Sequence, residues 1–169
     1  MATETYTDAI ALLKADHRKV EALFEKFESA SDGSKQAIAE KICNELKIHT
    51  MIEEEIFYPA LDGKIEEETL SEAYVEHDGA KVLINDIMAG GPDDQFYDSK
   101  VKVLSEEIEH HVKEEEAQSE GMFAQARGSY VDLVALRDTM LARKEELMAQ
   151  IENGGELPPA QMATMPAAN

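Results

Sequence analysis

Apolar residues recur three and four positions apart along most of the chain, which places them on one face of an α-helix. Between residues 7 and 29 this pattern includes Ile10, Leu13, Val20 and Phe24. The strict alternation of apolar and polar residues that marks β-strands does not recur. The sequence therefore predicts an all-α fold.

Turn and capping signals divide the pattern into five helical segments. Four of them are joined by short connections, which is typical of antiparallel neighbours and predicts an up-down-up-down four-helix bundle. The boundaries come from the Ser31-Asp32-Gly33-Ser34 turn, Pro59, a Thr69-x-x-Glu72 capping box, Gly90-Gly91-Pro92 and Gly121.

The fifth segment, at about residues 129–151, has a broad apolar face. We expect this helix to pack across the bundle, or to form the interface of a homodimer or of a complex with a protein partner. Residues 1–152 then form one domain, with a core at about residues 10–127. Residues 153–169 contain several prolines and no apolar face, so we expect a disordered tail.

The charge of the chain limits its partners. The formal net charge is −20, which repels nucleic acids and anionic membranes. No stretch approaches the roughly 18 uninterrupted apolar residues of a membrane span, and the first twenty residues lack a signal-peptide pattern, so we expect a cytoplasmic protein. The single cysteine, Cys43, lies beside a helical stripe and is expected to be a buried structural thiol.

Four histidines fall on the apolar stripes of four different segments, and two are followed by a glutamate four residues later. Residues at this spacing project from one helix face about one turn apart. One such pair means little in a chain with 36 acidic residues. Burying all six groups together, however, would cost several kcal/mol unless a metal bound them. The predicted metal ligands are His17, His49, Glu53, His77, His111 and Glu115.

His110 also has a glutamate, Glu114, four residues later. Position 110 lies about 100° around the helix from His111, away from the apolar stripe. We therefore expect His110 to be solvated or to support a neighbouring ligand, and His111 to face the core.

The donor set indicates two metal ions rather than one. Six donors exceed the four ligands of a closed zinc site, and the chain has no thiolate cluster. Imidazole and carboxylate ligands suit iron, zinc or manganese. Carboxylate and histidine sites in helical bundles typically hold two iron or two manganese ions, and we favour iron.

At these residues the chain resembles the hemerythrin-like family, the HHE cation-binding domains. The similarity covers about residues 10–127 and rests on the motif order Asp16-His17, His49-x-x-x-Glu53, Glu76-His77 and His111-x-x-x-Glu115. The resemblance implies a non-haem di-iron centre. In it, Glu53, Glu115 and a solvent-derived oxo or hydroxo group bridge two iron ions, and the four histidines are terminal ligands.

Two departures separate this chain from the oxygen carriers of that family. The carriers have a His-x-x-x-His pair on the third helix, whereas Ala73 and Lys81 flank His77 here. Tyr74 could fill the vacancy as a ligand, donate a hydrogen bond or merely pack, and water is another candidate. The carriers also have an aspartate one position beyond Glu115, a difference shared with bacterial members, so we favour a bacterial origin.

An iron pair with fewer protein ligands than that of the oxygen carriers changes the expected function. We expect a di-iron protein that binds dioxygen, or senses oxygen or iron, without being a dedicated enzyme. One alternative is a di-iron oxidoreductase that turns over peroxide or nitric oxide. Another is a protein-interaction module under metal control.

Overall fold

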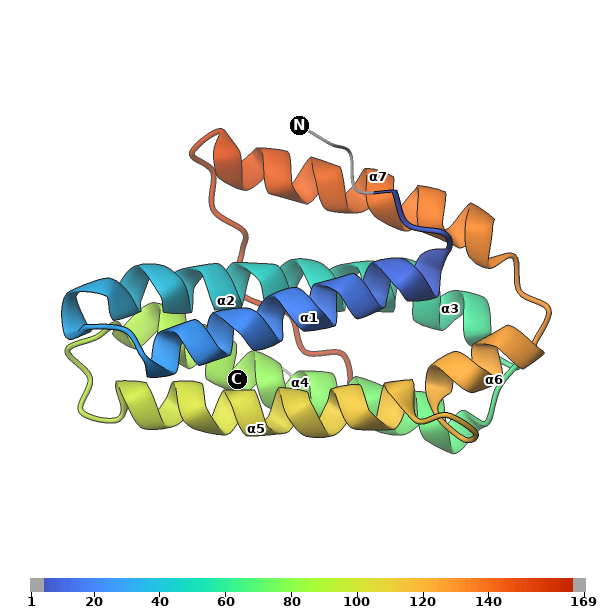
Figure 1. Ribbon diagram of the computed structural model, residues 1–169, viewed down its shortest axis with the longest axis horizontal. Coiled ribbons are helices and arrows are strands. Elements are labelled where there is room, and N and C mark those ends of the chain that lie inside the picture. Colours follow the sequence, from blue (N-terminus) through green and yellow to red (C-terminus); the bar gives the residue numbers. More distant parts are fainter. Residues whose placement is uncertain (1–4, 166–169) are drawn as a thin grey trace.

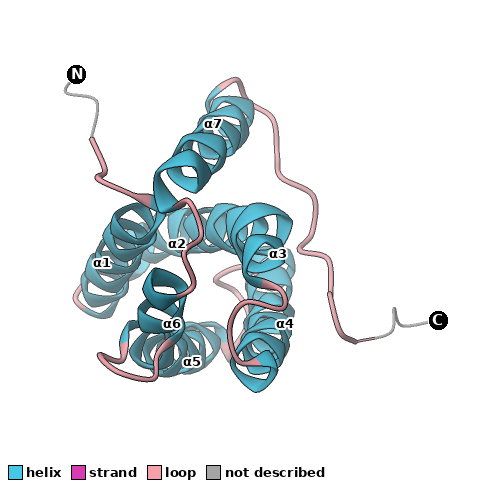
Figure 2. Ribbon diagram, turned by 90° about the vertical axis from the view of Figure 1, so that its right-hand side faces the viewer, coloured by secondary structure: helices cyan, strands magenta, loops and turns pink. Residues whose placement is uncertain are grey.

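In the computed structural model, which describes residues 5–165, all regular elements are helices. Four long helices run side by side along the molecule (Figure 1). They are α1 (Ala9–Glu28), α2 (Asp32–Ile52), α4 (Glu67–Gly90) and α5 (Tyr97–Glu116). Viewed end-on, they surround a common centre (Figure 2). The prediction of an all-α fold is confirmed for the described residues.

Shorter elements connect and cover the long helices. A π-helical turn, η1 (Glu53–Phe57), follows α2 without a break and leads into α3 (Tyr58–Leu61). The short helix α6 (Met122–Gly128), which the sequence pattern did not predict, precedes α7 (Leu133–Glu152). None of the helices in residues 5–165 is long and apolar enough to cross a lipid bilayer.

Local sequence signals account for some of the helix ends. The Asp8 side chain caps α1 by accepting a hydrogen bond from the Ala11 amide at 2.9 Å. After α4, Gly91 adopts φ +69°, a left-handed conformation that favours glycine. The predicted capping box at Thr69 is wrong, because α4 begins earlier and the Thr69 hydroxyl instead accepts a hydrogen bond from Gln125 of α6.

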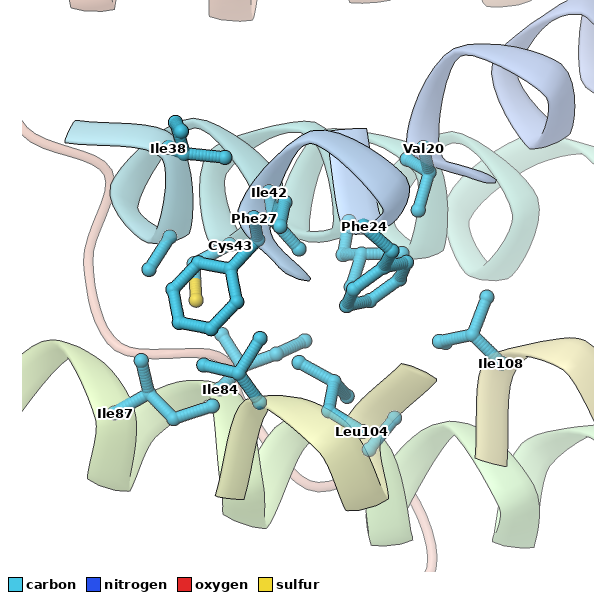
Figure 3. Close-up of a cluster of buried hydrophobic side chains, with 14 of the residues drawn as sticks. Val20, Phe24, Phe27, Ile38, Ile42, Cys43, Ile84, Ile87, Leu104 and Ile108 are labelled. Carbon is cyan, nitrogen blue, oxygen red and sulfur yellow. The ribbon is translucent and has the colours of Figure 1, made fainter. Parts of the chain in front are cut away.

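Two apolar clusters fill the ends of the bundle. The first joins the C-terminal half of α1 and the first part of α2 to α4 and α5, with Val20, Phe24, Ile84 and Leu104 among its members (Figure 3). Cys43 lies in this cluster, and burial raises the pKa of its thiol to about 12. This confirms the expectation of a buried structural thiol.

The second cluster lies at the other end, where α1 begins and α3 and α6 cover the bundle. It includes Leu13, Phe57, Tyr58 and Phe123, each at most 3% exposed. Five of the six predicted metal ligands lie on the four long helices and the sixth, Glu53, begins η1. All six lie between the two clusters, so apolar residues shield them from both ends.

Helix α7 lies against α1 and α2 on the outside of the bundle (Figure 2). It buries Met140, Lys144 and Leu147 and leaves Val134 about half exposed. The expectation that this helix packs across the bundle agrees with its position. Its buried lysine is notable, because a buried ammonium group needs a charged partner.

The structure corrects the prediction of a disordered tail. Residues 157–165 run as an extended strap over α4, where Asp78 accepts hydrogen bonds from the Ala163, Thr164 and Met165 amides at 2.7–3.1 Å. Asn85 exchanges two hydrogen bonds with the Ala160 backbone. The strap is held by polar anchors on α4 rather than by an apolar face, so hydrophobic patterning did not indicate it. Residues 166–169 lie outside the described residues.

Candidate metal centre

The first half of the centre joins α1 and α2. The Nε2 atoms of His17 and His49 lie 3.2 Å apart. His49 Nε2 is 3.2 Å from Glu53 Oε1, and His17 Nε2 is 3.2 Å from Glu115 Oε2. Two imidazole nitrogens and two carboxylate oxygens therefore converge on one point.

The second half joins α4 and α5 in the same way. The Nε2 atoms of His77 and His111 are also 3.2 Å apart. His77 Nε2 is 3.1 Å from Glu53 Oε2, and His111 Nε2 is 3.2 Å from Glu115 Oε1. Each glutamate thus directs one oxygen to each pair of histidines, which is the arrangement of a bridging carboxylate.

The spacing of these atoms fits bound cations. Ligand atoms about 2.1 Å from one metal ion lie roughly 3.0–3.4 Å apart at octahedral or tetrahedral angles. Glu53 Oε1 and Glu115 Oε2 are fully buried and have no hydrogen-bond partner, and the same holds for His17 Nδ1. A cation between the histidine nitrogens and these oxygens would remove the cost of burying them unpaired. The six predicted ligands therefore meet in one place, as two groups that could each hold a metal ion.

Carboxylates also approach the outer nitrogens of the histidines. Asp16 Oδ2 of α1 lies 3.3 Å from His49 Nδ1 of α2. In the other half, Glu76 Oε2 of α4 lies 2.5 Å from His111 Nδ1 of α5. A carboxylate accepts but does not donate, so each one holds a proton on Nδ1 and leaves Nε2 to bind a cation.

The remaining two histidines face carboxylates from the opposite pair of helices. Glu54 Oε1 is 2.9 Å from His77 Nδ1, and Glu116 Oε2 is 3.8 Å from His17 Nδ1. The two halves of the centre are therefore built alike, down to their outer carboxylates. Basic side chains neutralise three of these carboxylates: Lys144 pairs with Asp16, Lys81 with Glu54 and Arg18 with Glu116.

Sequence analysis did not identify these outer carboxylates, although a signal was present. An acidic residue directly precedes His17 and His77, and a second glutamate directly follows Glu53 and Glu115. These positions point sideways from the helix and reach the histidine of a neighbouring helix. In a chain so rich in glutamate, the same pattern is also typical of a solvated face.

Tyr58 is the main side chain at the centre to which the sequence analysis assigned no role. Its hydroxyl lies 2.9 Å from Glu115 Oε1, 3.1 Å from His77 Nε2 and 3.3 Å from Glu53 Oε2. The π-helical turn sets this position, because i to i+5 pairing places Tyr58 one turn above Glu53. The second half of the centre thus has five nearby donors and the first half has four.

Two residues weighed from the sequence lie outside the centre. The Tyr74 ring packs edge-on against Tyr58 with ring centroids 5.1 Å apart, which matches the packing alternative. The His110 side chain is 64% exposed and contacts Glu76 and Glu114 instead.

The buried charges shift each other's pKa values. Burial alone lowers the pKa of His49, but Glu53 and Asp16 outweigh it and raise that pKa to about 10. Burial likewise lowers the pKa of His111, and Glu115 and Glu76 raise it well above its usual value. A cation bound at these nitrogens must displace their protons, so metal binding would release protons.

Comparison with known proteins identifies relatives of this chain. The sequence model of the hemerythrin HHE cation binding domain family matches residues 8–126. The crystal structure of a hemerythrin HHE cation binding domain-containing protein from Mycobacterium kansasii has the same fold. It aligns with a TM-score of 0.71 and 20% identity over 89% of this chain and 95% of that chain.

A curated relative is similar over a shorter segment. A protein of Nostoc named DNA nickase is 30% identical over 107 residues, or 63% of this chain. The chain spans only 30% of the length of that relative. The similarity therefore concerns a part of a longer protein.

Proposed function

Because the chain belongs to the hemerythrin HHE cation-binding family, we propose that its converging side chains hold two iron ions. The supporting observation is that the two oxygens of each buried glutamate face different histidine pairs. The proposed ligands are His17 and His49 for one ion, His77 and His111 for the other, and Glu53 and Glu115 as bridges. The nitrogen and oxygen donors suit iron in a helical bundle.

The first half of the centre is the side where we propose that a small ligand binds. It has fewer protein donors than the half next to Tyr58. Its surroundings are also apolar, because the His17 ring stacks on Phe123 with centroids 5.8 Å apart and Phe57 packs edge-on against Phe123. Both phenylalanines are at most 3% exposed, so they limit the access of water.

These features favour a binding or sensing role. Bound iron would supply reversible electron exchange with dioxygen, and the family provides a cation-binding scaffold. The outer carboxylates hold the histidine rings in place, and the apolar cover restricts proton access to the small ligand. We therefore propose that the protein binds dioxygen, or senses oxygen or iron, through this centre.

One observation favours a second function, the reduction of peroxide or nitric oxide. The Tyr58 hydroxyl donates to Glu115 and lies beside His77, so a proton donor stands next to the centre. Both reductions consume protons. The net charge of −20 repels DNA phosphates, which disfavours nicking of DNA as a function of this chain.

The role of Tyr58 can be tested by spectroscopy. If its phenol binds ferric iron, the iron-loaded protein should show a phenolate-to-iron charge-transfer band that Tyr58→Phe removes. Tyr74→Phe is the matched control and should keep the band, because Tyr74 only packs against Tyr58. Loss of the band in Tyr74→Phe alone would contradict this assignment.

Oxygen exposure separates binding from turnover. The reduced iron-loaded protein is mixed with oxygenated buffer and then returned to anaerobic conditions while its absorption spectrum is followed. A spectrum that reverts supports oxygen binding. Irreversible oxidation, with sustained consumption of added peroxide or nitric oxide, supports the oxidoreductase alternative.

A further inference from the structure

A surface pocket leads from solvent to the proposed metal centre. It has a volume of about 370 Å³ and is lined by residues of α4, α5 and the start of α6. Its wall includes the proposed ligands His111 and Glu115. Seven of its thirteen lining residues are glutamates, so the pocket concentrates negative charge beside a buried cation site.

Three side chains beside this pocket form a second group of potential metal ligands. Glu76 and Glu114 line the pocket, and His110 lies next to them on α5. His110 Nε2 is 3.4 Å from Glu76 Oε1 and 3.2 Å from Glu114 Oε1. One donor atom from each residue lies within 4.8 Å of the others. These are the donor types of the buried centre, but His110 and Glu114 are exposed.

Two observations connect this group to the buried centre. Glu76 spans the distance between them, because its other oxygen lies 2.5 Å from His111 Nδ1. Glu115 is 2% exposed, its Oε2 atom has no hydrogen-bond partner, and the residue lines the same pocket. The pocket whose rim carries the exposed group therefore extends to one of the two proposed bridging glutamates, although the unpaired Oε2 atom of this glutamate faces His17 in the first half of the centre.

We propose that Glu76, His110 and Glu114 form an uptake site where a ferrous ion is first captured on its way to the buried centre. This inference rests on the proposed function, since it needs a buried iron pair to fill. The acidic lining raises the local concentration of cations and speeds their capture. Three ligands at an exposed position leave the remaining coordination positions to water, so the ion is held weakly and can move on.

The rate of metal uptake tests this inference. Metal-free protein is mixed anaerobically with ferrous iron in a stopped-flow instrument, and the bound iron is counted after equilibration. The double variant His110→Ala/Glu114→Gln spares Glu76, which supports His111. We expect uptake to slow by about tenfold or more, the lower end of electrostatic rate effects, while the final count stays at two ions per chain. Glu145→Gln, an exposed change of equal charge on α7, should leave the rate unchanged.

Equilibrium titration gives an independent measurement. Cobalt(II) added to metal-free wild-type protein should occupy two tight sites and one weak site, and the double variant should lack only the weak site. An unchanged uptake rate, a weak site that persists in the double variant, or loss of a tight site would each overturn the uptake site. Fewer than two tight sites in the wild type would instead contradict the proposed function, and the weak site would still be counted separately.

Discussion

Glu53 and Glu115 combine two properties at the residue scale. Each is buried, and each faces both pairs of histidines. The charges of neighbouring histidines hold the pKa of Glu115 well below its usual value despite burial. A charged carboxylate can share its two oxygens between two cations, whereas a neutral amide is a poor bridge.

This difference predicts graded effects on metal binding for three variants in which a glutamate is replaced by glutamine. Glu53→Gln should lose at least one metal ion after dialysis, because the bridge is removed. Glu54→Gln should weaken metal affinity by about 10- to 100-fold, because Glu54 orients His77. Glu55→Gln should retain both ions, since Glu55 pairs with Arg143 at the surface. Equal metal loss in all three variants would point to a general effect of charge.

Cys43 provides a prediction that depends on its pKa. Burial raises the pKa of the Cys43 thiol to about 12, so the reactive thiolate is scarce at pH 8 in the folded protein. Iodoacetamide should therefore modify Cys43 very slowly in native protein. In denaturant the pKa returns toward its ordinary value of about 8.5, and modification should be rapid. Rapid labelling of the native protein at pH 8 would contradict this burial.

The sequence could predict which six side chains converge, because each one obeys the periodicity of a regular helix. His49 and Glu53, like His111 and Glu115, are four residues apart on apolar stripes. The outer carboxylates could not be predicted in this way, because each contacts a histidine on a different helix. Their partners depend on how the helices are arranged in space.

At the scale of elements, the π-helical turn explains why Tyr58 escaped sequence analysis. In a regular α-helix, residues five positions apart differ by about 140° around the axis, so Tyr58 would point away from the face of Glu53. The π-helical turn η1 brings both to one face. The regular α-helical periodicity instead indicated Tyr74, which is three residues before His77 and packs against Tyr58.

The strap is the second element that patterning could not predict, and it depends on Asp78. Burial raises the pKa of Asp78, but hydrogen bonds from Thr164 and from the amides of residues 163–165 outweigh it and hold the pKa below its usual value. This carboxylate therefore stays charged at neutral pH. It anchors the strap beside Lys81, which donates to the Gln161 carbonyl at 2.8 Å.

Removing this charge should release the strap. Asp78→Asn loses hydrogen bonds to a charged acceptor, each worth about 1.5–3 kcal/mol. Amides 163–165 should then exchange with deuterium at least about tenfold faster. Asp93→Asn, in the exposed connection before α5, is the control and should leave this exchange unchanged. Unchanged exchange in Asp78→Asn would show that other contacts hold the strap.

At the scale of the whole molecule, the proposed centre lies between two apolar clusters and receives ligands from α1, α2, α4 and α5. Bound metal would join all four helices, and α7 and the strap contribute through Lys144 and through Gln161, which binds Lys81. The all-α fold and the family could be predicted from the sequence, because both depend on local spacing. The position of α6 could not, because its buried Met122 and Phe123 pack in an apolar cluster with residues of α1 and η1 that are distant in the sequence. The position of the strap could not, because the strap is held by polar contacts with α4.

The metal content of the protein tests the central proposal most directly. Metal-free protein is loaded anaerobically with ferrous iron and dialysed, and its iron and protein concentrations are then measured. We expect two iron ions per chain in the wild type and at most one in Glu115→Gln. A single ion in the wild type, or two ions retained by Glu115→Gln, would contradict a pair of ions bridged by glutamates.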